Sequence, residues 1–544
     1  MLHLGGMAMK YSRLLVIGLD GMTFDLYKQY KARGIFKNIT EMMNKGVYGN
    51  LKSVIPTDTV PAWACFYTGK NPGKIGVYGT SKKESFGART VSSKDVKSRK
   101  IWNYLNENGY TTGLFAIPLT YPPEPVSGFM VSGMLTPDIK SNFTYPEELK
   151  EEILRISPSY RVSFEVKKSE TIMDAINRSF EARVKVATYL LGKRKCDFVM
   201  VVFNETDWME HFMWKYIDKN HPFFENNKKK EEEVIDFLRQ VDKAIGDFKN
   251  LFSSDTNIII MSDHGAGILH GHFNINDWLI QNGYLAMRKK QKGISKGLAK
   301  IGITREKLLA ISLKLGLREL TKQLPFWIRR SIPEEKNVIE WDDALAFNYV
   351  DWEKTKAWAL GNGIYINTKN PEEYIKIRNN ILNDIKNLKP PVGNDLNITI
   401  YKKEDLFSGD YLDGAPDLIP LFGEYKFLLS TSIGNNDFFT FDKVKRSRNA
   451  SHRLNGIFIA YGPDIKGGGK KLEGTSILDL APTILHMYNV PVPEDMDGKV
   501  LKEIFKGNSE PRRREVKYQR AGKEGGERGK IKERIRKLKV GERI

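Results

Sequence analysis

Cysteine is scarce in this sequence: only 2 of the 544 residues are cysteines, Cys65 and Cys196. Two thiols cannot build a disulfide framework or a cysteine-based zinc site, so both classes are excluded. Long apolar runs are also missing, because segments such as Phe198–Phe203 fall far short of the roughly 18 residues that a membrane-spanning helix needs. No apolar signal-peptide core follows the start of the sequence. We therefore expect a cytoplasmic protein.

Positive charge is concentrated in two segments and is not spread along the chain. The formal net charge is +20. Residues 287–330 contain 13 Lys and Arg against 2 Asp and Glu, and residues 509–544 contain 14 against 6, which together supply 19 of the 20 charges. We therefore do not expect nucleic acid as the ligand of the main body, although the tail could contact it. The second segment is expected to be a basic, flexible tail with a short helix at residues 531–540.

The remaining sequence alternates between short apolar runs and helical patterns. Hydrophobic residues make up 41% and aromatic residues 11%, which is enough for a sizeable core and excludes a disordered chain. Short apolar strands that alternate with helices indicate an α/β fold whose mostly parallel central sheet has helices on both faces. The expected strands are Arg13–Leu19, Phe198–Phe203 and residues 111–117, 257–261, 361–366 and 456–461. The expected helices lie within residues 22–43, 62–68, 101–108 and 475–488, and residues 54–61 are expected to form a loop.

The first basic segment also divides the predicted domain. Residues 1–286 and 334–508 are expected to form one discontinuous α/β domain, interrupted at residues 287–333 by a helical insertion in which leucines interleave with Lys and Arg. Three roles stay open for this insertion. It could form a cap whose charge attracts an anionic substrate, it could lie on an anionic membrane surface, or it could pack its leucines on the core and leave a solvated basic face.

The 8 histidines of the chain mark a candidate metal site. Asp20 follows a predicted strand, Asp263 and His264 follow another, and Asp207 and His211 are four residues apart, which on a helix places them on one face. With His452 these residues supply three carboxylates and three imidazoles, a set that suits zinc and tolerates manganese or magnesium. Two such ions about 4 Å apart can hold the attacking and leaving oxygens of a phosphoryl transfer. Taken singly, most of these residues would fit ordinary structural roles such as a helix cap or a surface pair.

A nucleophile for such a site is offered by Thr57 and Thr59, two hydroxyls in a proline-bounded loop that opens a helix. A helix N-terminus stabilises an anionic phosphoryl group, and a nearby metal lowers the pKa of a hydroxyl. These arguments do not choose between the two threonines.

Taken together, five motifs resemble those of the alkaline phosphatase superfamily. Within it they resemble the type I phosphodiesterase/nucleotide pyrophosphatase family, in a prokaryotic or archaeal-like branch. The motifs are VIGLDG, PTDTVPAWACFYTGKNPGKIGVYG, NETDWMEH, MSDHGAG and ASHRLNGIFIAYGP. The resemblance implies an alkaline-phosphatase-like core that holds two divalent metal ions, expected to be zinc, with manganese as the alternative. It assigns Asp207, His211 and His452 to one metal and Asp20, Thr59, Asp263 and His264 to the other. It also makes Thr59 the nucleophile, because the family nucleophile lies two residues before the proline of this loop.

One position departs from the family pattern. Eukaryotic-type members carry an asparagine after that proline, where its amide holds a phosphate oxygen, whereas this sequence has Ala62 followed by Trp63. Another donor must replace the amide, and the backbone N–H of Thr59 or Val60 is a candidate. His270 and Trp63 are weaker candidates for substrate contact.

The predicted function is hydrolysis of phosphoric esters through a phosphothreonine intermediate. The expected substrate is an anionic phosphoester, either a nucleotide or a lipid-linked phosphoester. Alternatives within the superfamily are a phosphomonoesterase, a phosphotransferase or a phosphoglycerate-mutase-like enzyme. A sulfatase is disfavoured, because the nucleophile motif lacks the convertible Cys or Ser and its Arg. A different class, a basic binding protein with a residual metal site, would be expected to have lost at least one ligand, yet all seven positions are filled. The sequence does not determine the oligomeric state.

Overall fold

The computed structural model describes residues 12–84, 87–288, 349–388, 396–435 and 437–520. The basic insertion expected at residues 287–333 lies outside these residues apart from Met287 and Arg288, and so does the predicted helix at 531–540. Among the described helices, none has the length and apolarity that crossing a membrane would require.

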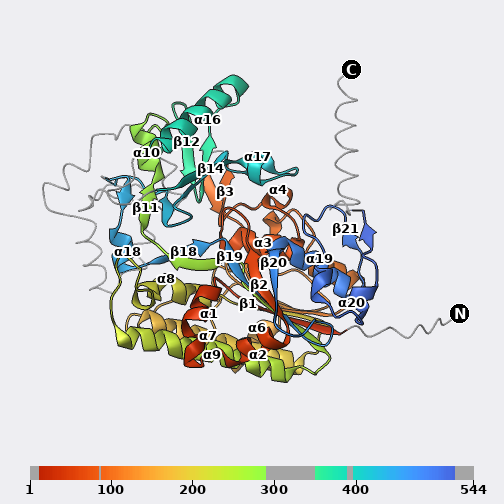
Figure 1. The fold of residues 1–544 in the computed structure, drawn as a ribbon. Helices are drawn as coiled ribbons and strands as arrows, with labels where there is room; N and C mark the ends of the chain where they lie inside the picture. Colours follow the sequence, from red (N-terminus) through yellow and green to blue (C-terminus); the bar gives the residue numbers. More distant parts are fainter. Residues whose placement is uncertain (1–11, 85–86, 289–348, 389–395, 436, 521–544) are drawn as a thin grey trace, which may run out of the picture.

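A central sheet of nine strands, within the described part of the chain, forms the body of the molecule (Figure 1). Five of its strand pairs are parallel, and antiparallel pairing occurs only on both sides of β19 and at β7. The predicted mostly parallel α/β sheet is therefore confirmed. In spatial order the strands are β20 (Lys470–Ser476), β2 (Val47–Lys52), β19 (Asn455–Tyr461), β9 (Thr256–Met261), β1 (Arg13–Leu19), β8 (Phe198–Phe203), β5 (Thr112–Ile117), β6 (Gly128–Ser132) and β7 (Thr144–Tyr145).

Helices cover both faces of this sheet, because alternate side chains of each central strand point to opposite faces. In β1, Leu15 and Ile17 join the core on one face, whereas Leu14 and Val16 join the core on the other. The first face is covered by α1 (Phe24–Tyr30), α2 (Lys37–Lys45), α6 (Leu149–Ile156), α7 (Ile172–Lys193), α8 (Glu205–Ile217) and α9 (Lys228–Leu251). The second is covered by α3 (Thr59–Thr68), α5 (Ile101–Glu107) and α19 (Leu480–Met487), with the short α4 (Pro72–Ile75) and α20 (Glu510–Arg513) beside them.

Two helix boundaries differ from the sequence prediction. The helical pattern within residues 22–43 is broken into α1 and α2, because Gly34 adopts a left-handed conformation, with φ of 69°, after a short 3-10 turn. The helix α3 begins at Thr59 and not at residue 62. Pro61 had suggested a loop, but proline is tolerated in the first turn of a helix, where its missing N–H has no partner to lose.

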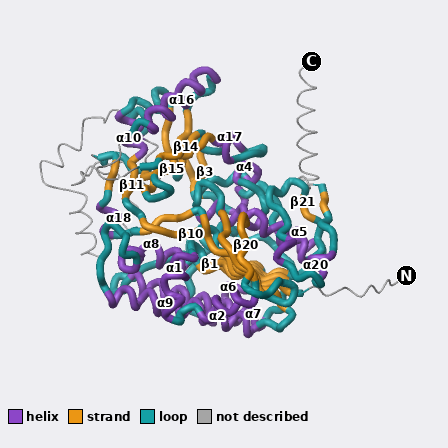
Figure 2. The backbone as a smooth tube through the Cα atoms, viewed as in Figure 1, coloured by secondary structure: helices purple, strands orange, loops and turns teal. Residues whose placement is uncertain are grey.

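A second sheet, of which only the strand at residues 361–366 was predicted, stands above the first together with three helices of the described residues (Figures 1 and 2). It has its own apolar core, separate from the two cores of the central sheet. Its strands are, in order, β12 (Ala357–Leu360), β13 (Gly363–Ile366), β15 (Leu418–Phe422), β16 (Phe427–Ser430), β11 (Gly271–Asn274) and β17 (Phe439–Thr440), with β14 (Ile398–Lys402) paired to β15. The helices are α10 (Ile275–Gln281), α16 (Pro371–Lys386) and α17 (Lys403–Leu406).

Part of the segment expected as a flexible tail is folded against the body. Arg514 donates a hydrogen bond to the carbonyl of Met487 at 2.7 Å. The strand β22 (Tyr518–Gln519) pairs in parallel with β21 (Val492–Pro493). The tail expected from residue 509 is thus an ordered extension of the body up to residue 520. The remaining small elements are the β3 (Ser81–Glu84) and β4 (Gly87–Thr90) hairpin, α18 (Asp442–Arg446), and the pair formed by β10 (Gly265–Ile268) and β18 (Ala450–Arg453).

Candidate metal centre and active site

The candidate site lies at the carboxyl ends of three neighbouring parallel strands, β9, β1 and β8. Asp20 directly follows β1, and Asp263 comes two residues after β9. After β8 the chain enters α8, which carries Asp207 and His211 one turn apart. An open parallel sheet presents its ligand site at this edge, so the placement follows from the topology.

A short antiparallel ladder brings the distant His452 to the same place. In the β10–β18 pair, His452 lies opposite Ala266, two residues beyond His264. The ladder therefore joins a histidine near the end of the chain to the Asp263–His264 motif.

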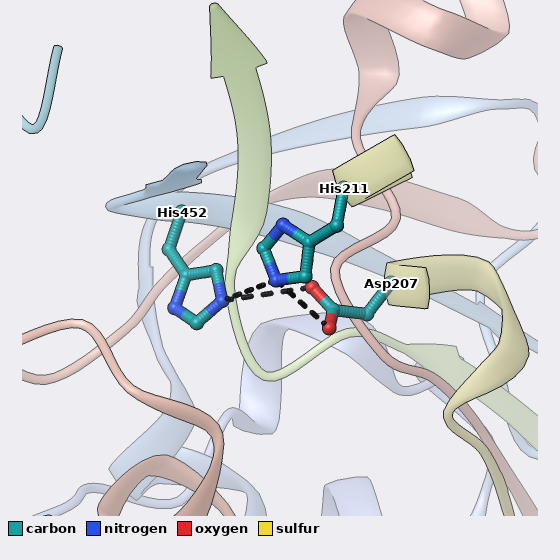
Figure 3. A group of neighbouring side chains, drawn as sticks. All are labelled: Asp207, His211 and His452. Atoms are coloured by element: carbon teal, nitrogen blue, oxygen red, sulfur yellow. Dashed lines mark hydrogen bonds and ion pairs between the residues drawn. The ribbon is translucent and has the colours of Figure 1, made fainter. Parts of the chain in front are cut away.

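One group of candidate ligands is formed by Asp207, His211 and His452, whose side chains point toward one another in Figure 3. The Nε2 of His211 lies 3.1 Å from Asp207 Oδ2 and 3.2 Å from the Nε2 of His452. The Nε2 of His452 lies 3.6 Å from Asp207 Oδ1. This is one of the two sets that the sequence analysis assigned to a metal.

The second group contains Asp20, Asp263 and His264, all of them fully buried. The Nε2 of His264 lies 3.3 Å from Asp263 Oδ2 and 3.6 Å from Asp20 Oδ1. The hydroxyl of Thr59 approaches the same nitrogen at 3.2 Å. The structure therefore brings all seven predicted residues together, in the two sets that the resemblance implied.

Hydrogen bonds fix the tautomer of all three imidazoles. Their Nδ1 atoms lie 3.0 Å from the carbonyl of Ala450 for His211, 3.1 Å from that of Gly265 for His264, and 2.9 Å from that of Thr57 for His452. A carbonyl oxygen only accepts, so each Nδ1 carries the proton and each Nε2 turns a lone pair toward the carboxylates. Carbonyl contacts of this kind are typical of histidines that ligate a metal through the other nitrogen.

The electrostatics of the two groups are unfavourable without a cation. Burial, together with the charges of Asp263 and Asp207, raises the pKa of Asp20 well above its ordinary value, and burial raises the pKa of Asp263 in the same direction. Burial lowers the pKa of His264 to about 4. Burial opposes the ionisation of Asp207, but His211 and the other imidazoles hold its pKa below its ordinary value.

Buried oxygens of the same carboxylates have no hydrogen-bond partner in the described part of the chain. These oxygens are Asp20 Oδ1, Asp207 Oδ1 and Asp263 Oδ2. Carboxylate oxygens and neutral imidazole nitrogens that converge in this way are the donor set of zinc or manganese. The residues present therefore fit two divalent cations.

The structure distinguishes the two candidate threonines. Thr57 is held by other groups: its hydroxyl lies 2.8 Å from the hydroxyl of Tyr425 and its carbonyl accepts from His452. Thr59 is the first residue of α3, and its hydroxyl faces His264. Asp58 caps this helix by accepting from the N–H of Val60 at 3.3 Å. Only Thr59 thus has a hydroxyl turned toward the ligand groups.

The other predicted contact residues lie elsewhere. Trp63 is fully buried, and its indole N–H donates to Oδ2 of Asp20 at 3.3 Å, so it supports a ligand and is not placed to touch a substrate. His270 lies outside both ligand groups, and its backbone N–H donates to the carbonyl of Lys426 at 2.7 Å. The buried side chain of Ala62 offers no polar atom.

Three residues around the site were not found from the sequence. Asn204, directly after β8, donates its side-chain N–H to Oδ2 of Asp20. The guanidinium of Arg448 lies beside His452, with Nη2 and Nε2 3.2 Å apart. Asn362, in the turn between β12 and β13, donates to Oδ2 of Asp58 at 3.3 Å. Only Asn204 carried a sequence signal, since it is a polar residue at the end of an apolar strand.

Comparison with known proteins agrees with this site. Two adjoining carboxylate–imidazole groups at the carboxyl edge of a mostly parallel sheet are a site typical of metal-dependent hydrolytic enzymes. More particularly, the model of the type I phosphodiesterase/nucleotide pyrophosphatase family matches residues 14–316, and the chain belongs to this family. No protein in the search of curated proteins matches the chain.

Solved structures share the fold at low sequence identity. Human ectonucleotide pyrophosphatase/phosphodiesterase 5 aligns with a TM-score of 0.50 and 14% identity, over 91% of this chain and 100% of that chain. The murine protein of the same name aligns with a TM-score of 0.49 and 12% identity, over the same shares. The likeness to the human protein shows the fold alone.

Proposed function

We propose that the protein is a phosphodiesterase of the nucleotide pyrophosphatase type, which acts through a covalent phosphothreonine on Thr59. The observation that carries the proposal is the position of the Thr59 hydroxyl, 3.2 Å from the Nε2 of His264 at the first residue of α3. No other threonine of this loop has its hydroxyl turned toward the two ligand groups, since that of Thr57 faces Tyr425.

The two ligand groups support a pair of divalent ions in this proposal. Asp207, His211 and His452 would hold one ion, and Asp20, Asp263 and His264 the other, with zinc as the expected metal. When bound, two such ions lower the pKa of nearby hydroxyls and neutralise charge on phosphoryl oxygens.

The residues of this chain divide the reaction into two steps. The oxygen of Thr59 forms a bond to phosphorus as the bond to the leaving alcohol breaks, and the hydroxyl proton is released. Water then attacks the phosphothreonine, and the bond between phosphorus and the Thr59 oxygen breaks to regenerate the hydroxyl. The N-terminus of α3, where Thr59 lies, stabilises the negative phosphoryl group through its helix dipole.

The test compares the two threonines on three substrates. Wild type, Thr59→Ala and Thr57→Val, each reconstituted with zinc or manganese, are assayed on bis-p-nitrophenyl phosphate, p-nitrophenyl phosphate and thymidine monophosphate p-nitrophenyl ester. We expect turnover of the diesters that falls by more than about 10³-fold in Thr59→Ala and far less in Thr57→Val. Mass spectrometry of the acid-quenched wild type should locate the phosphoryl group on Thr59.

Each other outcome corrects a separate part of the proposal. A preference for the monoester would make the enzyme a phosphomonoesterase, and activity that persists in Thr59→Ala would exclude this nucleophile. If metal-reconstituted wild type hydrolyses none of the substrates, transfer to a selective acceptor becomes the better description.

A further inference from the structure

The turn that carries Thr59 has few donors left for the oxygens of a phosphoryl group. The side chain of Ala62 is apolar, and the N–H of Val60 is engaged by the carboxylate of Asp58. Of the two backbone donors expected from the sequence, Thr59 N–H and Val60 N–H, only that of Thr59 remains. One N–H donates a hydrogen bond to one oxygen. A phosphoryl group under attack has two non-bridging oxygens, so besides the two ions the site has room for a further hydrogen-bond donor.

A guanidinium lies beside His452, the candidate ligand whose Nδ1–H donates to the carbonyl of Thr57 in this turn. Arg448 stands between α18 and β18, where its Nε donates to the carbonyl of Ala450 at 3.3 Å and its Nη2 lies 3.2 Å from the Nε2 of His452. Both Asp207 and Asp58 attract it electrostatically, while burial lowers its pKa. Asp58 directly precedes Thr59, so a carboxylate next to the nucleophile is among the charges that act on this guanidinium.

Arg448 has no ion-pair partner in the described part of the chain, where no carboxylate oxygen lies within 4.0 Å of its guanidinium nitrogens. A partly buried guanidinium normally pairs with a carboxylate or a phosphate, because two of its N–H groups match two oxygens. The missing partner therefore fits an anion that enters the site.

The contact with His452 does not explain why an arginine is present. The orientation and tautomer of His452 are already set by its Nδ1–H, which donates to the carbonyl of Thr57 at 2.9 Å. The lone pair that Arg448 meets on Nε2 is the one that this histidine would use toward a cation. With a cation in place, the Nη2 donor of Arg448 would lose this acceptor and would be free for another.

We propose that Arg448 binds the non-bridging oxygens of the phosphoryl group that Thr59 attacks, and so takes over the role of the family asparagine that is absent at Ala62. This inference rests on the function proposed above. It assigns a specific residue to substrate binding. The same contact is expected with any ligand that has a free phosphoryl group, including inorganic phosphate.

The test measures binding of inorganic phosphate to zinc-reconstituted protein by isothermal titration calorimetry, so that no turnover is needed. The variants are Arg448→Ala, Arg448→Lys and, as a matched control, Lys445→Ala. Lys445 is an exposed cation of the same segment, and its ammonium lies over the ring of Phe223, 5.1 Å from the centroid. The zinc content of each protein is measured in parallel.

We expect Arg448→Ala to weaken phosphate binding at least roughly 10-fold at unchanged zinc content, the loss typical of a hydrogen bond to a charged group. Arg448→Lys should recover part of the affinity, because it keeps the charge but loses the paired donors. Lys445→Ala should stay within about twofold of wild type, as for an exposed charge. Free guanidinium ion should restore binding to Arg448→Ala and not to Lys445→Ala.

Unchanged phosphate affinity in a zinc-replete Arg448→Ala protein would overturn the inference. Loss of zinc from Arg448→Ala and Arg448→Lys would also overturn it, since the arginine would then support His452. If Arg448→Ala does not fold, the Arg448→Lys variant decides. Phosphate affinity equal to that of wild type in Arg448→Lys contradicts the inference, and reduced phosphate affinity in this variant at full zinc content supports it. Failure of wild type to hydrolyse any ester would reject the proposed function while leaving this binding comparison intact.

Discussion

The imidazole rings of His264 and His452 lie face to face, with their centroids 3.7 Å apart and their planes at 21°. Each ring belongs to a different ligand group, and the β10–β18 ladder fixes the backbones that carry them. The two ligand groups therefore adjoin each other through these stacked rings. A substitution of either histidine is expected to change the geometry of both groups.

The first prediction concerns Asn204, which donates to the Oδ2 of Asp20. Asn204→Ala removes a hydrogen bond that orients a ligand carboxylate, so zinc affinity should fall roughly 10–100-fold. Competition with a chromophoric chelator measures this affinity. Asn282→Ala, which removes a side-chain bond at the end of α10, far along the chain from the ligands, is the control and should bind zinc as wild type does. Equal affinity in both variants would contradict the role of Asn204.

A second prediction compares two glycines with similar backbone angles. Gly21 has φ of 76°, and a Cβ built there would lie 2.5 Å from Oε2 of Glu210 and 3.1 Å from Oδ1 of Asp207. Gly283 has φ of 71° with nothing within 4 Å of such a Cβ. Gly283→Ala should cost roughly 1–2 kcal/mol of unfolding free energy from backbone strain alone. Gly21→Ala should cost more and should also lose zinc, because the methyl group displaces two carboxylates.

Urea denaturation and zinc analysis of the two alanine variants check this expectation. A Gly21→Ala protein that keeps its zinc and loses no more stability than Gly283→Ala would show that the contact with Asp207 is easily relieved.

The third prediction concerns a buried ion pair next to the site. The Nε of Arg183 lies 3.1 Å from Oε1 of Glu205, both side chains are almost fully buried, and Ser179 donates to the same oxygen at 2.7 Å. Glu205→Gln leaves the guanidinium without a counter-charge and should cost about 3–5 kcal/mol of unfolding free energy. The double variant Arg183→Met with Glu205→Leu removes both charges and should recover most of that loss. Chemical denaturation of wild type, Glu205→Gln and the double variant measures these differences. A double variant less stable than Glu205→Gln would contradict the proposed cost of the unpaired guanidinium.

The fourth prediction is a dependence of stability on pH that originates at Glu152. Hydrogen bonds from Lys193, Tyr189 and Arg194 lower the pKa of this carboxyl from 4.5 to about 2. A lowered carboxyl pKa stabilises the folded state above pH 4.5, and that stabilisation is lost as the pH falls from about 4.5 toward 2. Glu152→Gln should therefore be less stable than wild type at pH 7, by about 1 kcal/mol, and the difference should shrink on acidification.

Denaturant titrations of wild type and Glu152→Gln at pH 7 and pH 3.5 test the sign of this effect. A stability difference that grows at the lower pH would show that the carboxylate does not act through its ionised form.

The sequence was sufficient to predict five of the nine described strands of the central sheet, and the family resemblance named the six residues of the two ligand groups together with Thr59. Strands such as Phe198–Phe203 are buried on both faces and therefore appear as continuous apolar runs. The ligands could be found because strand ends of a parallel sheet converge at one edge, and because their types and order match a family.

Most of the second sheet and the supporting residues could not be predicted in this way. Strands such as β11 and β16 are four residues long, and they are brought together from positions more than 150 residues apart. Arg448 acquires its place through a turn before β18, and nothing local distinguishes it from other basic residues of that segment. Contacts of this kind arise only when the tertiary fold forms.

The hydrogen bond from Asn362 to Asp58 is one of the contacts between the second sheet and the body, and the bond between Tyr425 and Thr57 is another. Asn362 lies at the tip of the β12–β13 hairpin, whereas Asp58 caps the helix that begins with Thr59. Because hydrogen bonds weaken steeply with distance, a displacement of the upper sheet by about 1 Å would break this bond. The geometry of the α3 cap, and of the turn that carries Thr59, therefore depends on where the tip of the β12–β13 hairpin lies.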